Sequence, residues 1–151
     1  MLKNTPKVDL YIVGEGYLHQ ELIELTHKLV INKNVHFLGK TEFVNEFLSS
    51  IDLFVLSSKY EGFGVVLLEA MISKKPILTA NNSAIPEVLG KSYEGLFPTG
   101  DVNALASKIN SVITDSNYTN LLVKSLSDQI KIFDPIEMSK KVNHVYSNAG
   151  F

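Results

Sequence analysis

The alternation of short apolar runs with stretches of helical spacing constrains the fold of this chain more than any other feature. Apolar, β-type residues predict strands at residues 8–13, 35–38, 52–56, 76–79 and 95–97. Between and after them, helical patterns begin near residues 18, 43, 64, 85 and 101. An alternation of this kind is typical of the α/β class, here a Rossmann-like parallel sheet flanked by helices.

The end of the chain follows a different pattern, with two successive helices predicted at residues 117–133 and 134–147. The second opens with a capping residue, a proline at the first helical position and a glutamate in the capping-box position, as Asp134-Pro135-Ile136-Glu137. We therefore expect a Rossmann-like domain over residues 1–115 and C-terminal helices over residues 116–151 that pack on the same domain.

Composition excludes several classes of protein. The formal charge of −2 argues against a nucleic acid as partner, because proteins that bind nucleic acids are normally basic. The chain has no cysteine, and its four histidines do not have metal-ligand spacing, so we expect no metal site. The apolar runs are too short to span a bilayer and the first residues lack a signal-peptide core, which favours a cytoplasmic protein.

Ligands of parallel α/β sheets bind outside the carboxyl ends of the strands. Five loops of this chain are expected there, namely residues 14–16, 39–41, 57–64, 80–86 and 98–101. Loop 57–64 is the most informative, because Glu61 precedes Gly62 and Gly64 at a predicted helix start, and Glu69 follows in the second turn. A glycine-bearing turn before a helix can bind a phosphate, and the two carboxylates can accept hydrogen bonds from hydroxyl groups.

Each of these features also has a purely structural interpretation. Gly62 and Gly64 can simply form the turn, and Glu69 can be paired within the protein. Gly14-Glu15-Gly16 begins like a dinucleotide fingerprint, but His19 stands where the third glycine belongs, which favours a plain tight turn. The loop of Asn81, Asn82, Ser83 and Ala84 fits pocket lining and turn formation equally well.

The motifs taken in order resemble the C-terminal, nucleotide-sugar-binding half of retaining GT-B glycosyltransferases of the family 4 (group 1) type. The resemblance covers about residues 8–114. Its pieces are Ile12-Val13-Gly14-Glu15-Gly16, Asn34-Val35-His36-Phe37-Leu38-Gly39, Asp52-Leu53-Phe54-Val55-Leu56-Ser57-Ser58, Glu61-Gly62-Phe63-Gly64-Val65-Val66-Leu67-Leu68-Glu69-Ala70-Met71, Pro76-Ile77-Leu78-Thr79, Pro86-Glu87-Val88, Gly100-Asp101 and Ala104-Leu105-Ala106.

This resemblance implies a role for each matching residue. Glu61, the candidate catalytic residue, would contact the hydroxyls of the donor sugar, and Glu69 would accept hydrogen bonds from the ribose. The backbone around residues 62–66 would hold the sugar and the diphosphate, and residues 38–40 would lie against the base. The predicted donor site is Gly14, Leu38, Gly39, Lys40, Glu61, Gly62, Phe63, Gly64, Val65, Val66 and Glu69. The resemblance implies neither a metal nor any other cofactor.

The chain departs from the family pattern in two ways. Members carry a Gly-Arg…Lys segment that grips the diphosphate and an N-terminal acceptor-binding domain, and this sequence starts downstream of both. A glycine-rich loop before Pro-Glu is replaced by Asn81-Asn82-Ser83-Ala84-Ile85. We expect the chain to act together with an acceptor domain and, because the face toward that domain would be partly apolar, to self-associate.

The predicted function is transfer of a sugar from a nucleotide-sugar to a hydroxyl acceptor, with retained anomeric configuration. The alternative is a truncated remnant that binds nucleotide-sugars or another protein and transfers nothing. A third interpretation is half of a GT-B epimerase or hydrolase, because a fold alone does not define the reaction. Enzymes of this type are commonly used in polysaccharide biosynthesis. We expect the full-length enzyme to be cytoplasmic and peripheral to the membrane.

Overall fold

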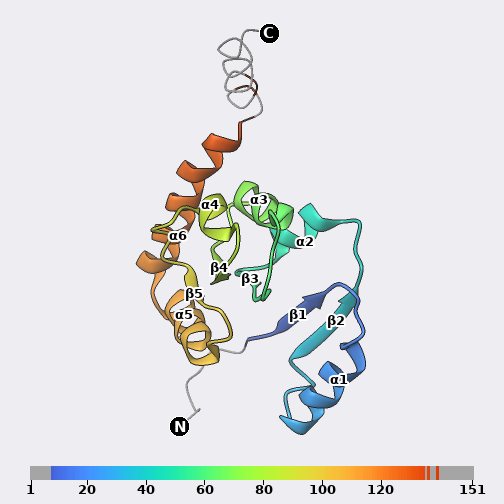
Figure 1. Cartoon of the computed structure of the whole chain (residues 1–151). Helices are drawn as coiled ribbons and strands as arrows, with labels where there is room; N and C mark the ends of the chain where they lie inside the picture. The colour runs from blue at the N-terminus through green and yellow to red at the C-terminus, as the bar shows by residue number, and fades with distance from the viewer. Residues whose placement is uncertain (1–7, 135, 137–138, 140–151) are drawn as a thin grey trace. The chain divides into compact units, whose positions relative to one another are not determined.

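The structure is a computed structural model that describes residues 8–134, 136 and 139 (Figure 1). The contacts of the chain divide it into two compact units, which we call unit 1 (Met1–Val44) and unit 2 (Asn45–Phe151). Among the described residues, unit 1 has a two-stranded sheet and unit 2 a three-stranded sheet. Every strand pairing in both sheets is parallel.

Unit 1 consists of strand β1 (Leu10–Val13), helix α1 (His19–Lys28) and strand β2 (Val35–Gly39). In the register of the two strands, Leu10 lies opposite Val35 and Ile12 opposite Phe37. The apolar stripe of α1 and the two strands together line a small, partly open apolar pocket of about 130 Å³. Of the described residues in this unit only Thr26 is buried, and its hydroxyl donates to the carbonyl of Ile23.

The sheet of unit 2 consists of β3 (Phe54–Leu56), β4 (Ile77–Asn81) and β5 (Leu96–Pro98), in the order β3-β4-β5. The central strand β4 is the most deeply buried, since residues 77–80 are each 0% exposed. A parallel strand covered on both faces needs a continuous apolar run, and residues 77–80 have one that is interrupted only by Thr79.

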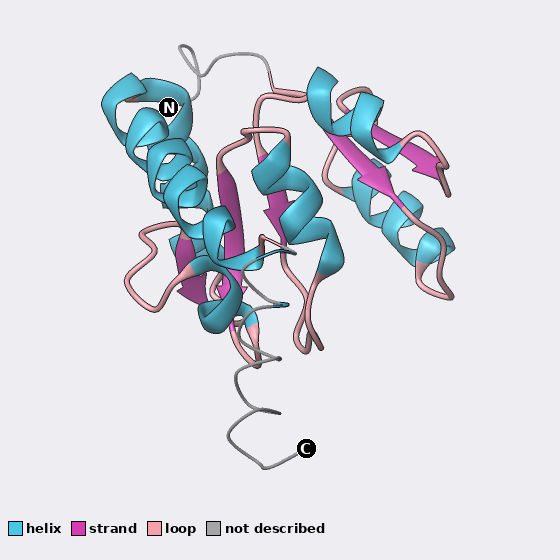
Figure 2. Ribbon diagram, turned by 90° about the horizontal axis from the view of Figure 1, so that it is seen from above, coloured by secondary structure: helices cyan, strands magenta, loops and turns pink. Residues whose placement is uncertain are grey.

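Helices flank this sheet, as Figure 2 shows. They are α2 (Val44–Ser50), α3 (Val65–Ile72), α4 (Ile85–Leu89), α5 (Val102–Thr114), α6 (Ser116–Gln129) and a 3₁₀ turn, η1 (Ile130–Phe133). The core of unit 2 combines these helices with the sheet. Its buried apolar side chains are Leu48, Leu67, Ala70, Met71, Ile77, Leu78, Ala80, Ile85, Val88, Leu89, Tyr93, Phe97, Leu122 and Leu126.

A buried tyrosine fixes the start of β4. The phenol oxygen of Tyr93 donates to the carbonyl of Ile77 over 2.7 Å and accepts from the Ile77 N–H over 3.3 Å. Burial raises the pKa of the Tyr93 phenol well above its usual value. Gly95 leaves space for this arrangement, because a Cβ at that position would lie 2.3 Å from the Ile77 carbonyl oxygen.

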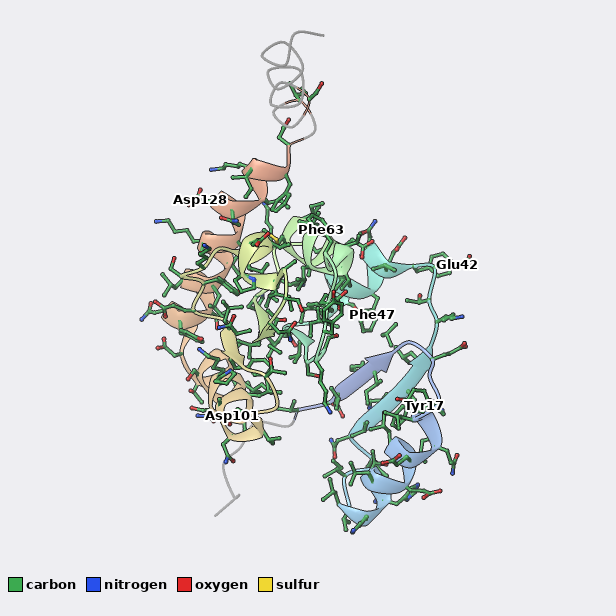
Figure 3. All side chains as sticks on the ribbon, in the orientation of Figure 1. Tyr17, Glu42, Phe47, Phe63, Asp101 and Asp128 are labelled. Carbon is green, nitrogen blue, oxygen red and sulfur yellow. The ribbon has the colours of Figure 1, made fainter. Side chains whose placement is uncertain are left out.

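Side-chain caps begin the two longest described helices. The Asp101 carboxylate accepts from the Ala104 N–H over 2.8 Å, which confirms the predicted cap of α5 (Figure 3). Asp115 accepts from the N–H groups of Asn117 and Tyr118 and begins α6. The helix predicted at 117–133 is α6 followed by the tighter turn η1, and the helix predicted at 134–147 lies almost wholly outside the described residues.

The predicted α/β class, with parallel strands flanked by helices, is confirmed. The strand limits differ by one or two residues from those expected, because apolar character at a strand end does not show where ladder pairing stops. The division into residues 1–115 and 116–151 remains a prediction. No helix in the described part of the chain is long and apolar enough to cross a bilayer.

Candidate functional site

The carboxyl ends of β1 and β2 are joined in unit 1 by a backbone hydrogen bond. The Gly14 N–H donates to the Gly39 carbonyl over 2.7 Å. Both glycines have a positive φ, 122° at Gly14 and 65° at Gly39, which a residue with a side chain adopts only with strain. The two loops that follow these strands therefore leave the sheet next to each other.

An open hollow of about 520 Å³ lies at this end of unit 1, lined by Glu15, Gly16, His19, Phe37, Leu38 and Gly39. The rings of His19 and Phe37 meet edge to face, with 5.2 Å between their centroids. Lys40 lies beside the hollow, with its ammonium nitrogen 3.5 Å from a carboxylate oxygen of Glu15. The hollow therefore combines an aromatic wall with one acidic and one basic group.

Four residues of this hollow are not among the predicted site residues: Glu15, Gly16, His19 and Phe37. The spacing of Gly14-Glu15-Gly16 and His19 favours a plain turn and not a binding site. Phe37 alternates with Leu38 along β2, so its side chain is on the strand face opposite that of Leu38. The signal that was available is the parallel pairing of the two strands, which brings the two loops to one edge.

In unit 2, loop 57–64 leads into α3 through a glycine in the left-handed conformation. Gly64 has φ 71° and ψ 57°, and its carbonyl accepts from the Leu67 N–H over 2.7 Å. A Cβ at Gly64 would lie 2.9 Å from a methyl carbon of Leu67 and 3.3 Å from Cγ of Glu61. No side chain caps this end of α3, so its first N–H groups and the positive end of its dipole are free to face an anion.

The two carboxylates of the motif lie on either side of this helix start. Glu61 and Glu69 are both half-buried. Glu69 lies in the second turn of α3, next to the buried residues Ala70 and Met71. Neither carboxylate is hydrogen-bonded or ion-paired to another described residue. Both carboxylates are therefore available to accept hydrogen bonds from a polar ligand.

Phe63, the last residue before Gly64 in loop 57–64, contacts the 3₁₀ turn η1. Its ring meets that of Phe133 in η1 edge to face, with 5.8 Å between the centroids. The Phe63 side chain nevertheless remains 47% exposed. Of the other predicted residues, Gly62 and Val65 are exposed and Val66 is half-buried.

The side chain of Asn82 links the three loops at the carboxyl end of the unit 2 sheet. Its Nδ2 donates to the Ser58 carbonyl over 2.6 Å, after β3, and to the Thr99 hydroxyl over 3.3 Å, after β5. The Thr99 hydroxyl also donates to the carbonyl of Asn81 over 3.3 Å. Loops 57–64, 80–86 and 98–101, which the sequence places at this edge, are thus hydrogen-bonded to one another.

The predicted donor-site residues fall into two groups. Gly14, Leu38, Gly39 and Lys40 belong to unit 1, and residues 61–66 and Glu69 belong to unit 2. Within the described ranges, no three histidine, aspartate or glutamate side chains gather closely enough to hold a metal ion.

Comparison with known proteins identifies the family. The family model described as glycosyl transferases group 1 matches residues 1–131. N-acetyl-alpha-D-glucosaminyl L-malate synthase of Bacillus anthracis is 36% identical over 107 residues, which cover 70% of this chain and 28% of that enzyme. A sulfoquinovosyl transferase of Arabidopsis thaliana is 26% identical over 156 residues, which cover 99% of this chain and 30% of the relative.

A solved structure agrees with these matches. The crystal structure of Anabaena Alr3699/HepE in complex with UDP aligns with a TM-score of 0.84 and 25% identity, over 95% of this chain and 42% of that chain. The chain therefore spans less than half the length of these relatives. From its matched residues, its parallel α/β fold and its motif series, the chain belongs to the group 1 glycosyl transferases, as a C-terminal domain of that family.

Proposed function

We propose that this chain is the donor-binding part of a glycosyltransferase that moves a sugar from a nucleotide-sugar to a hydroxyl acceptor with retention. One observation carries the proposal: α3 begins at a left-handed glycine, without a side-chain cap, between two half-buried carboxylates that have no partner among the described residues. An anion and several hydroxyl groups would satisfy such a site together, and a nucleoside diphosphate sugar supplies both.

The start of α3 would bind the diphosphate. When the bond between the sugar and the diphosphate breaks, negative charge develops on the departing phosphate oxygen. N–H groups at the helix start, already oriented by the loop, would stabilise that charge without reorganising. We therefore propose that the reaction needs no metal ion, and activity that disappears with EDTA and returns with Mg²⁺ would contradict this.

The two carboxylates would recognise the rest of the donor. Glu61, in the loop, would accept hydrogen bonds from the sugar hydroxyls next to the reacting carbon. Glu69 lies one to two turns further along α3 and would accept from the ribose. In unit 1, residues 38–40 and the hollow beside them would receive the base. The aromatic wall formed by His19 and Phe37 is suited to the flat face of such a ring.

We propose uracil as the base to test first. The Anabaena relative has been crystallised with UDP and also with UDP-glucose, and the backbone of this chain follows that protein closely. The experiment is a calorimetric titration of this chain with UDP, GDP and ADP. Saturable binding of UDP that is at least tenfold tighter than that of the other two nucleotides is the expected result.

Glu69→Gln provides the decisive variant, because it keeps the size of the side chain and removes its charge. We expect at least a tenfold loss of UDP affinity, as a hydrogen bond to a charged acceptor is typically worth about 1.5–3 kcal/mol. Glu46→Gln is the matched control, since Glu46 is an exposed glutamate on α2 of the same unit. An absence of binding to all three nucleotides, or equal affinity of both variants, would favour the remnant that transfers nothing.

The remaining proposals concern partners and location. We propose that activity needs an acceptor-binding domain, that the chain self-associates through the exposed, partly apolar face toward that domain, and that the enzyme is cytoplasmic and peripheral to the membrane. Sedimentation over a range of concentrations tests self-association, and a single monomeric species at the highest concentration would contradict it.

A further inference from the structure

We propose that Asn82 is a positioning residue, whose side-chain amide holds loop 57–64 in the shape that receives the donor. The inference rests on the proposed function of that loop, but its first test does not need a ligand. Asn82 follows β4, whereas the loop that it holds follows β3 and contains Glu61 and Gly64. The residue would therefore act through the loop and not by contact with the reacting atoms.

The geometry of the amide supports this role. Nδ2 has two hydrogens, and two acceptors lie within reach, the Ser58 carbonyl at 2.6 Å and the Thr99 hydroxyl at 3.3 Å. Ser58 is 24 residues away in the sequence, so the bond fixes tertiary structure and not a local turn. A carboxylate of the same size has no hydrogen to donate and would repel the Ser58 carbonyl.

The turn at Asn82 does not itself need this side chain. Backbone hydrogen bonds already form this turn. The Asn82 N–H donates to the Ala80 carbonyl, and the Asn82 carbonyl accepts from the Ile85 N–H, each over 3.1 Å. The amide oxygen, moreover, is buried without a hydrogen-bond partner among the described residues. Such burial costs free energy, so the orientation of the amide is determined by what Nδ2 reaches.

The loop is held near both of its ends. Asn82 holds its beginning at Ser58, whereas the Phe63–Phe133 contact and the bond from the Leu67 N–H to Gly64 hold two adjacent residues at its end. Glu61 lies between these two ends. Loss of the amide therefore releases the segment that contains Lys59, Tyr60 and Glu61, while the start of α3 keeps its own bonds.

Trypsin provides a test that needs no ligand, because Lys59 is exposed and directly follows Ser58. The folded chain is digested under native conditions, and mass spectrometry measures the rate of cleavage after Lys59. We expect this rate to be about tenfold higher in Asn82→Ala and in Asn82→Asp than in the wild-type chain. Asn81→Ala is the matched control, since the Asn81 side chain is exposed and only its carbonyl takes part in the network. Equal rates in Asn82→Ala and Asn81→Ala, or wild-type behaviour of Asn82→Asp, would overturn the proposal.

A second variant decides the question if Asn82→Ala does not fold. Thr99→Val removes the hydroxyl that accepts from Asn82 but leaves the bond to Ser58, so cleavage after Lys59 is expected to be about threefold faster. Urea unfolding of every variant separates this local release from a general loss of stability. Unchanged cleavage in a folded Thr99→Val would count against the network.

Nucleotide titration then connects the position of the loop to binding. In Asn82→Ala we expect UDP affinity to fall about tenfold, with wild-type affinity in Asn81→Ala. Faster cleavage with unchanged affinity would overturn the role in binding. If the wild-type chain binds none of the three nucleotides, the proposed function fails, and the cleavage rates still decide whether Asn82 holds the loop.

Discussion

The two units of this domain differ in how deeply their strands are buried, although each unit has parallel strands with loops at their carboxyl ends. Unit 2 has a central strand whose residues 77–80 are each 0% exposed. In unit 1, Thr26 is the only buried residue among those described, and strand residues such as Leu10 remain about half exposed. Three strands with covered faces form an independent core, whereas two strands and one helix contribute little burial on their own.

The residues of the proposed donor site therefore come from two units that we expect to differ in stability. The residues proposed for the sugar and the diphosphate belong to unit 2, and those proposed for the base belong to unit 1. Local opening is easiest where few apolar contacts are buried. We therefore expect amide hydrogen exchange to be faster in β1 and β2 than in β4, and four sets of variants sharpen or break this contrast.

The largest difference is expected for matched leucines on the strands of the two units. Leu78→Ala empties a fully buried site in β4 and should lower the free energy of unfolding by about 3–4 kcal/mol. Leu10→Ala, on β1, removes a side chain that is 49% exposed and should cost about 1 kcal/mol. Urea unfolding monitored by circular dichroism measures both, and equal losses would show that unit 1 is buried as deeply as unit 2.

Tyr93→Phe is expected to have the next largest effect, about 2 kcal/mol, because both polar backbone groups of Ile77 lose their partner. The same exchange at Tyr17 in unit 1, where the side chain is 95% exposed, should change stability by less than about 0.5 kcal/mol. Thermal unfolding at neutral pH provides the comparison.

Tyr93 also predicts a dependence on alkaline pH. Because burial raises the pKa of its phenol in the folded state, the folded chain keeps this proton when the unfolded chain loses it, near pH 10. The contribution of Tyr93 is therefore fully present below about pH 10 and decreases at higher pH, by up to about 1.4 kcal/mol per pH unit. An identical alkaline slope in Tyr93→Phe would contradict this assignment.

Two glycines with a similar positive φ, Gly64 and Gly39, allow a third comparison. Gly64→Ala in unit 2 places a Cβ 2.9 Å from a Leu67 methyl carbon, and backbone strain adds to this crowding, so we expect a loss of about 2 kcal/mol. At Gly39 in unit 1 the nearest atom would lie 3.9 Å away, so Gly39→Ala should cost only the strain, about 1 kcal/mol. Chemical denaturation measures the difference, and a larger loss at Gly39 would contradict the crowding at the start of α3.

The smallest effects are expected at the two edge-to-face aromatic pairs. Phe133→Leu removes the partner of Phe63 and should cost about 1 kcal/mol, together with faster cleavage by trypsin after Lys59. Phe37→Leu in unit 1 removes the partner of His19 at a similar energetic cost but should leave that cleavage unchanged. The same cleavage rate in both variants would show that Phe133 does not hold the loop.

Residues with local consequences could be predicted from the sequence. The alternation of apolar runs and helical spacing predicts the parallel α/β class, and the position of Asp101 predicts the cap of α5. The glycines at positions 62 and 64 predict a turn before α3, and Gly64 has the positive φ that a glycine tolerates. Each of these inferences depends on residues within one turn or one strand.

Features that depend on distant contacts could not be predicted in this way. Nothing near Asn82 in the sequence indicates that its amide reaches Ser58, 24 residues earlier. Single-residue patterns cannot reveal the pairing of Phe63 with Phe133, because that contact requires the path of α6 and η1. In unit 1, parallel pairing predicts that the two loops share one edge, but not that Phe37 and His19 meet there, since this contact forms only after the strands have paired.

The hydrogen bond from Asn82 to Ser58 has a consequence for grafting loops of this domain onto related domains. Loop 57–64 is not an independent module, because a side chain from loop 80–86 determines how it begins. Transplanting loop 57–64 alone into a relative would transfer its glycines and carboxylate without the amide that orients them. A transfer of the proposed donor site to a relative would therefore have to move both loops as one unit.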